Sequence, residues 1–186
     1  MTKKLVMRTF VAVEINNEEV RNSIKKIQSE LKINAKPVSL ENIHFTLLFL
    51  GEISNEKSEK VQKALDSIEF SPFEVEFSGI GAFPKPKFPR VVWIGTDEVG
   101  GNQLINLAKK VEEKLLPLGF RSDKPFKPHV TIFRIKNRIG DISAELAKLN
   151  SSSLGNQKIS EIKFKKNVLT SDGPVYSDLH IVEGKL

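Results

Sequence analysis

Hydrophobic and polar positions along this chain follow two spacings, the alternation of a half-buried strand and the three-to-four-residue period of an amphipathic helix. Residues 5–15 are rich in β-branched and apolar side chains and predict a strand. The next apolar positions recur at spacings of four, three and four, which predicts a helix; they are Val20, Ile24, Ile27 and Leu31. Further strands are expected at 42–50, 73–78, 91–95, 129–135 and 159–169, helices at about 54–68, 101–116 and 141–149, and a hairpin turning near 172–174.

The order of these elements repeats after a shift of 85 residues. The segment 83–90, FPKPKFPR, is too rich in proline for a regular element, and we interpret it as the boundary between the halves. The prediction is a single α+β domain over 1–186 with a duplicated, two-lobed fold. Its lobes come from about 1–83 and 91–186, with a possible exchange of strands. Two antiparallel sheets face a central cleft and the helices lie outside.

One short motif occurs in both halves at the same shift. His44 stands in the stretch IHFTL and His129 in the stretch PHVTI, each with a threonine two residues later, Thr46 and Thr131. The chain has three histidines, so two of them occupy equivalent strands. Packing does not require the same polar pair twice on one face. The duplication therefore favours a functional over a structural interpretation of these histidines.

The spacing also predicts where the motif side chains point. Because side chains alternate between the faces of a strand, each histidine shares a face with its threonine. The opposite face carries the expected core residues Ile43, Phe45, Leu47, Phe49, Val130 and Ile132. If the lobes are related by a pseudo-twofold axis, two imidazoles and two hydroxyls meet at one cleft. Such a pair suits phosphoester chemistry, with one histidine as base and one as acid, and requires no metal or other cofactor.

Composition and charge further narrow the classes of protein and of site that the chain could represent. The chain has no cysteine, which excludes disulfides, thiolate nucleophiles and cysteine-ligated metal centres. No apolar run approaches the ~20 residues of a membrane-spanning helix, and a signal sequence is not recognisable, so we expect a cytoplasmic protein without membrane contact. Residues 84–138 hold 12 basic and 5 acidic residues, which suggests an anionic partner, although a solvated lysine-rich surface is the simpler explanation.

With both motifs in place, the chain resembles the 2H phosphoesterase superfamily, and within it the RNA 2′,3′-cyclic phosphodiesterase (2′-5′ RNA ligase) family. The matching stretches are RTFVAVEI, IHFTLLFLGEI, VVWIG, KPHVTIFRIK and GPVYSDL. The resemblance implies a bilobal fold and an enzyme that opens a ribose 2′,3′-cyclic phosphate to a 2′-phosphate. Some members also join tRNA halves through a 2′-5′ linkage without ATP. It places His44, Thr46, His129 and Thr131 at the motif positions.

We therefore expect attack of water on the cyclic phosphorus, with His129 as base and His44 as acid towards the 3′ oxygen, or with these roles exchanged. The expected partner is an RNA end with a 2′,3′-cyclic phosphate, such as a tRNA fragment, bound by a monomer. Two alternatives remain open. One is a general RNA-cleaving transphosphorylase that uses the substrate's 2′ hydroxyl, and the other is an RNA-end-binding module without turnover.

Several basic and aromatic residues could support these roles. Arg134 follows His129 by five residues, where the first half has Phe49, and it reaches the cleft only past a bulge or a strand end. Lys127 and Phe126 precede His129 and suit an RNA end, unless the phenylalanine anchors the loop to the core. Further candidates are Arg8, Lys85, Lys87, Arg90, Phe120, Arg121 and Lys124. Trp93 is expected in the core, and His180 on an exposed strand face without a metal.

Overall fold

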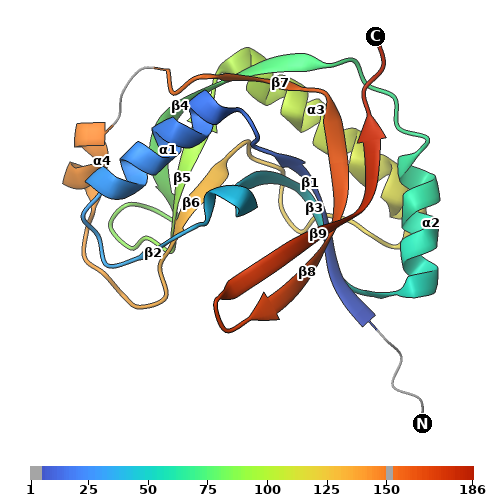
Figure 1. Ribbon diagram of the computed structural model, residues 1–186, viewed down its shortest axis with the longest axis horizontal. Helices are drawn as coiled ribbons and strands as arrows, with labels where there is room; N and C mark the ends of the chain where they lie inside the picture. The colour runs from blue at the N-terminus through green and yellow to red at the C-terminus, as the bar shows by residue number, and fades with distance from the viewer. Residues whose placement is uncertain (1–5, 150–152) are drawn as a thin grey trace.

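The computed structural model describes residues 6–149 and 153–186, which form two antiparallel sheets and four α-helices (Figure 1). The four-stranded sheet has the order β3-β1-β8-β9, with β1 (Val6–Glu14), β3 (His44–Ser54), β8 (Glu161–Thr170) and β9 (Gly173–Glu183). The five-stranded sheet has the order β2-β6-β5-β4-β7, with β2 (Lys36–Pro37), β4 (Phe73–Phe83), β5 (Val91–Thr96), β6 (Val130–Arg134) and β7 (Asn156–Ile159). Leu5, the first residue of the strand expected at 5–15, lies outside the described residues.

The helices lie on the outside of the two sheets (Figure 1). They are α1 (Glu18–Glu30), α2 (Asn55–Leu65), α3 (Glu98–Leu115) and α4 (Ser143–Leu149), with 3-10 turns at Leu40–Asn42 and Leu116–Leu118. Helix α1 begins as expected, because the Asn17 side chain accepts a hydrogen bond from the amide of Val20 at 3.1 Å. The α+β class with two antiparallel sheets is confirmed.

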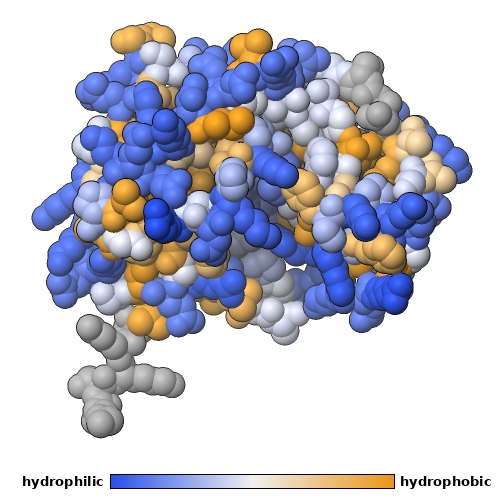
Figure 2. Space-filling view, turned by 180° about the vertical axis from the view of Figure 1, so that it is seen from behind, coloured by the Kyte–Doolittle hydropathy of each residue, from blue (hydrophilic) through white to orange (hydrophobic). Residues whose placement is uncertain are grey.

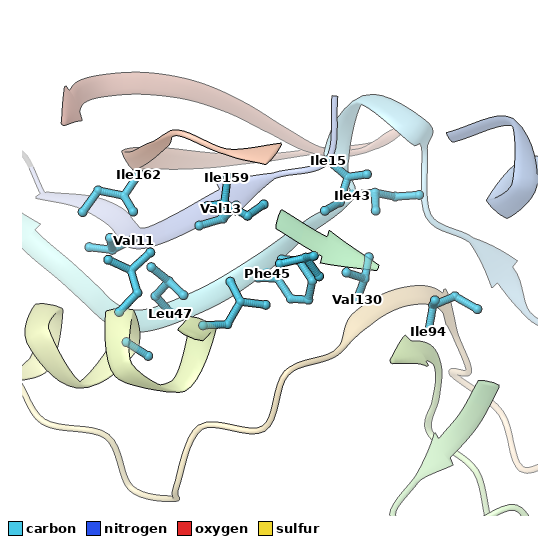
Figure 3. Close-up of a cluster of buried hydrophobic side chains, with 14 of the residues drawn as sticks. Val11, Val13, Ile15, Ile43, Phe45, Leu47, Ile94, Val130, Ile159 and Ile162 are labelled. Carbon is cyan, nitrogen blue, oxygen red and sulfur yellow. The ribbon is translucent and has the colours of Figure 1, made fainter. Parts of the chain in front are cut away.

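A single hydrophobic core joins the sheets (Figure 3). Phe45 of β3 and Phe77 of β4 are fully buried, and their rings stack with centroids 5.7 Å apart. Side chains of β1, β5 and β6 belong to the same cluster, among them Val11, Ile94 and Val130. The sheet faces that carry these residues are therefore packed into one core. The opposite faces remain available to form a site.

The proline-rich segment does not separate the sheets. Strands β4 and β5 pair with each other across it, with Phe83 opposite Val91, so 84–90 is a hairpin loop of the five-stranded sheet. The order β3-β1-β8 in one sheet repeats as β6-β5-β4 in the other. Each half thus gives its third strand to the sheet of the other half. The pairing thus shows the exchange of strands for which the prediction allowed, and the proline-rich segment connects two paired strands, because prolines interrupt a hairpin loop and a linker equally.

Two smaller differences from the expected strands concern residues 159–169 and residues 36–37. The single strand expected at 159–169 is two strands, with β7 paired to β4 and β8 paired to β1. The chain therefore passes from one sheet to the other at Ser160. Strand β2, with two residues, is too short for an alternation pattern to reveal.

Strands β3 and β6 each carry a bulge at the same place in the repeat. Opposite β3, Val11 pairs with Leu48 and Ala12 with Thr46, so Leu47 is the extra residue. Opposite β6, Val92 pairs with Phe133 and Trp93 with Thr131, so Ile132 is the extra residue. Alternation therefore shifts by one position after each threonine. Phe49, expected in the core, is 49% exposed for this reason.

Candidate active site

The two motif histidines lie in one cleft of about 620 Å³ between the sheets. His44 is the first residue of β3 and His129 directly precedes β6. Thr46, Thr131 and Arg134 line the same cleft. The space-filling view shows the surface hollowed near the middle of the molecule (Figure 2). Five of the seven residues proposed from the sequence are therefore brought together.

Both imidazoles are oriented in the same way by the backbone. Nδ1 of His44 lies 2.7 Å from the carbonyl oxygen of Asn42, and Nδ1 of His129 lies 2.6 Å from that of Lys127. A carbonyl oxygen only accepts, so Nδ1 donates its hydrogen in each ring. The neutral rings consequently carry their lone pair on Nε2. Nε2 of His44 is 2.8 Å from the Thr46 hydroxyl, which donates to it.

Aromatic side chains enclose the two rings unequally. His44 lies 5.0 Å from Phe10 and 5.4 Å from Tyr176, ring centre to ring centre. His129 meets the edge of Phe83 at 5.0 Å. Tyr176 and Phe83 were not predicted, because they reach the histidines through strand pairings between distant segments. His44 is the more enclosed of the two rings.

This enclosure sets the protonation of both rings. Burial lowers the pKa of His44 to about 4, with a smaller contribution from the cations of Lys165 and Arg134, while the hydrogen bond to the Asn42 carbonyl acts in the opposite direction. Burial also lowers the pKa of His129, assisted by Arg134 and Lys127 and opposed by the hydrogen bond to the Lys127 carbonyl. Both rings are therefore mainly neutral at pH 7 before substrate binds.

A cluster of paired charges lies beside His44. Glu14 stands directly opposite His44 in the strand register and binds the ammonium groups of Lys163 and Lys165. Lys165 is only 5% exposed and also contacts Asp178 at 2.8 Å. These cations are neutralised by carboxylates, so we assign the cluster to the support of His44 rather than to phosphate binding.

Arg134 reaches the cleft because of the bulge in β6. In an uninterrupted strand it would lie on the face opposite His129, but the extra residue Ile132 moves it to the same face. The bulge is held from behind by α1. The Gln28 amide donates to the carbonyl oxygens of Ile132 and Val38, each at 2.9 Å.

The loop before His129 lies at the edge of the site. Lys127 is exposed, with its ammonium group 5.9 Å from the centre of the Phe83 ring. Phe126 is partly buried and packs against the hydrophobic core, as does Phe120. Phe126 therefore anchors this loop, and the structure does not bring it into the cleft.

Two other residues singled out in the sequence, Trp93 and His180, have structural partners of their own. Trp93 pairs with Thr131 and packs on Phe83, so it lies on the cleft side of its sheet and not in the core as expected. His180 is bonded to a carboxylate oxygen of Asp66 at 2.6 Å. Among the described residues, no three histidine or acidic side chains gather as metal ligands.

The tip of the β8–β9 hairpin forms a wall of the cleft that sequence reasoning missed. Residues 169–176 line it, opposite Lys36 of β2. The Lys36 ammonium group donates to the carbonyl oxygen of Asp172 at 3.2 Å, and the Asn42 amide donates to that of Pro174 at 3.0 Å. The Lys36 bond joins the hairpin tip to the five-stranded sheet, and the Asn42 bond joins it to the turn before β3.

A family model described as LigT like Phosphoesterase matches residues 13–93 and again residues 94–176, so each match contains one histidine motif. This chain belongs to the LigT-like phosphoesterase family. The two matches confirm the family expected from the paired motifs. No helix within the described ranges is long and apolar enough to cross a membrane.

Relatives in the LigT-like family match along nearly the full chain. A protein of Archaeoglobus fulgidus named RNA 2′,3′-cyclic phosphodiesterase is 43% identical over 179 residues, which cover 95% of this chain and 100% of the relative. One of the same name from Aquifex aeolicus is 39% identical over 179 residues, covering 92% and 94%.

Solved LigT-like structures share the fold. A crystal structure of a Thermus thermophilus protein superposes with a TM-score of 0.75 at 27% identity, covering 95% of this chain and 97% of the other. Escherichia coli LigT complexed with 3′-AMP superposes with a TM-score of 0.79 at 22% identity, covering 98% and 100%.

Proposed function

We propose that this enzyme hydrolyses RNA 2′,3′-cyclic phosphate ends to 2′-phosphates. The observation that carries the proposal is the pair of equivalent imidazoles in one cleft, each with Nδ1 held by a backbone carbonyl. The names of the relatives support the same substrate.

The reaction requires one proton to leave water and one to reach the departing oxygen. We assign the base to His44, because two aromatic rings enclose it and burial disfavours its protonated form, so of the two imidazoles it is the one that stays neutral. His129 then donates its Nε2 proton to the 3′ oxygen as the bond between that oxygen and phosphorus breaks. These roles are the reverse of those given first in the sequence analysis, where His129 is the base and His44 the acid. The bound phosphate anion favours the protonated form of His129.

Thr46, Thr131 and Arg134 bind the phosphate oxygens in this proposal. Arg134 supplies a permanent, forked cation for the charge that develops in the transition state. Lys127 lies outside the cleft lining and attracts the RNA end from its edge. The two imidazoles perform both proton transfers, so the reaction is metal-independent.

The reverse reaction would join RNA ends through a 2′-5′ linkage, with tRNA fragments as substrates and the cytoplasm as the site of action. Both motifs come from one chain, so a monomer is sufficient. Transphosphorylation of a linear diester and RNA-end binding without turnover are the competing functions.

The test is incubation of the protein with a nucleoside 2′,3′-cyclic phosphate in EDTA, with the product isomer identified by phosphorus NMR. We expect the 2′-phosphate. A 3′-phosphate would contradict the assignment of the leaving oxygen, and no product from folded protein would favour the binding module. Cleavage of a linear diester with a free 2′ hydroxyl would favour the transphosphorylase.

A further inference from the structure

An exposed aromatic ring lies close to two cations at the end of the five-stranded sheet. Phe88, in the loop between β4 and β5, is 50% exposed. The Lys85 ammonium group is 5.4 Å from the centre of its ring and the Arg138 guanidinium is 5.6 Å from it. An exposed ring with flanking cations can stack on a nucleobase while the cations bind its phosphates.

This feature is continuous with the cleft. Arg134 and Lys136 line the cleft, and Arg138 follows two residues later. The Arg90 guanidinium donates to the carbonyl oxygen of Lys136 at 3.3 Å, which joins the two segments. The loop between β4 and β5 and the segment after β6 lie together at this end of the sheet (Figure 1).

Backbone hydrogen bonds fix these segments against each other. The amide of Ile135 donates to the carbonyl oxygen of Arg90 at 2.9 Å, and the amide of Ile142 donates to that of Pro86 at 3.1 Å. Beside Phe88 they enclose a hollow of about 380 Å³, lined by Lys87, Phe88, Arg138, Ile139, Gly140 and Asp141. The ring is therefore presented on a surface that is already ordered.

The charge of this surface is largely uncompensated. Its cations are Lys85, Lys87, Arg90, Arg134, Lys136 and Arg138. Within the described part of the chain, none of them lies within 4.0 Å of a carboxylate, whereas surface lysines such as Lys60 on α2 do. Asp141, the acid in the hollow, is bound by the amide and hydroxyl of Ser143, and these bonds and the charge of nearby Lys87 lower the pKa of its carboxyl. These cations hold most of the basic excess of residues 84–138.

We propose that this surface, the Phe88 strip, binds the single-stranded RNA that precedes the cyclic phosphate. The phosphates contact the cations and one base stacks on Phe88. The four steps along the chain from Arg134 to Arg138 span at most about 14 Å, which corresponds to roughly four stacked nucleotides at about 3.4 Å each. The preferred substrate is thus an oligonucleotide rather than a mononucleotide. This inference rests on the proposed function.

The test compares a nucleoside 2′,3′-cyclic phosphate with a six-nucleotide RNA that ends in the same group. Phe88→Ala should raise KM for the hexamer about tenfold and leave kcat and the mononucleotide kinetics unchanged. Arg138→Gln should reduce the salt dependence of hexamer binding by about 0.7 in the slope of log Kd against log salt. Val99→Ala and Lys109→Gln, at exposed positions on α3, are the matched controls. They should change neither KM for the hexamer nor the salt dependence of its binding.

Binding of a hexamer with a terminal 2′-phosphate, measured by fluorescence anisotropy, separates the two proposals because it needs no turnover. Weaker binding by F88A supports the strip even if the cyclic phosphate is not hydrolysed, in which case the proposed function alone fails. Equal binding by wild type, F88A and R138Q overturns the strip, whatever the activity on mononucleotides.

Discussion

His44 and His129 share one backbone arrangement but have different neighbours. Two aromatic rings and buried Lys165 surround His44, whereas Phe83 is the ring beside His129. The sequence predicts both histidines because the motif is repeated. It does not predict their difference in burial, because Tyr176 comes from the far end of the chain.

The lowered pKa of His44 predicts an acid-sensitive fold. As pH falls below 6.5, His44 is protonated in the unfolded chain but stays neutral in the folded one until about pH 4. Stability is therefore lost in this range. We expect His44→Gln to remove about 2 kcal/mol of the decrease in unfolding free energy between pH 7 and 4.5, measured by urea denaturation. An identical pH dependence in both proteins would contradict the burial of a neutral ring.

Substitution of Arg134 tests the proposed contact between its guanidinium and the phosphate. Arg134→Gln should lower kcat/KM by roughly 10²–10³-fold, the usual effect of removing one donor to a developing anion. Arg134→Lys should recover only part of this loss, because an ammonium lacks the forked geometry. The side chain is exposed, so circular dichroism and melting temperature should not change. Full activity of R134Q would show that Arg134 is only a surface charge.

At the level of elements, the bulges in β3 and β6 determine which residues face the cleft. Strict alternation correctly predicts His44, Thr46 and their partners in β6 but fails after each threonine. It places Phe49 in the core and Arg134 on the wrong face. A bulge depends on its pairing strand, and that of β6 also on Gln28 from α1, so the local pattern cannot reveal it.

Gln28→Ala tests whether Gln28 of α1 positions the Arg134 side chain in the cleft. The change removes a side-chain donor from the carbonyl oxygens of Val38 and Ile132, although that of Ile132 still accepts from the Val38 amide. It should cost about 1–2 kcal/mol of stability, with kcat/KM reduced about tenfold if the guanidinium moves. In an R134Q background the same change should have no further effect on kcat/KM. The control is Gln62→Ala, whose side-chain amide donates to the Ser58 hydroxyl within α2. Equal losses of activity in both backgrounds would show that Gln28 does not act through Arg134.

For the whole molecule, strand exchange joins the halves. The sequence predicts the duplicated order of elements and the facing sheets, and the strand order confirms both sheets as antiparallel. Which sheet receives β4 or β8 depends on packing between distant strands, and the prolines of 84–90 do not indicate it.

The buried side chain of Gln157 in β7 forms hydrogen bonds that link the two sheets. Its carbonyl accepts from the amides of Asn16 and Asn17 at 2.9 and 3.1 Å, and its amide donates to the carbonyl of Glu14 at 2.8 Å. Gln157→Leu should lower the unfolding free energy by about 3 kcal/mol, because three hydrogen bonds of about 1 kcal/mol each are lost. The exposed neighbour Lys158→Ala should stay within about 0.5 kcal/mol of wild type. Equal urea midpoints for both variants would contradict this role.

The most direct test of the paired-histidine account uses a 2′,3′-cyclic substrate with sulfur in place of the bridging 3′ oxygen. Sulfur leaves as a thiolate, which needs no proton, since thiols have a pKa of about 8.5. With the oxygen substrate, His44→Ala and His129→Ala should each lower kcat by about 10²–10⁴-fold. With the sulfur substrate, H129A should return to within about tenfold of wild type while H44A stays defective. Rescue of H44A instead, or no difference between the variants on both substrates, would contradict the division of base and acid between these two side chains.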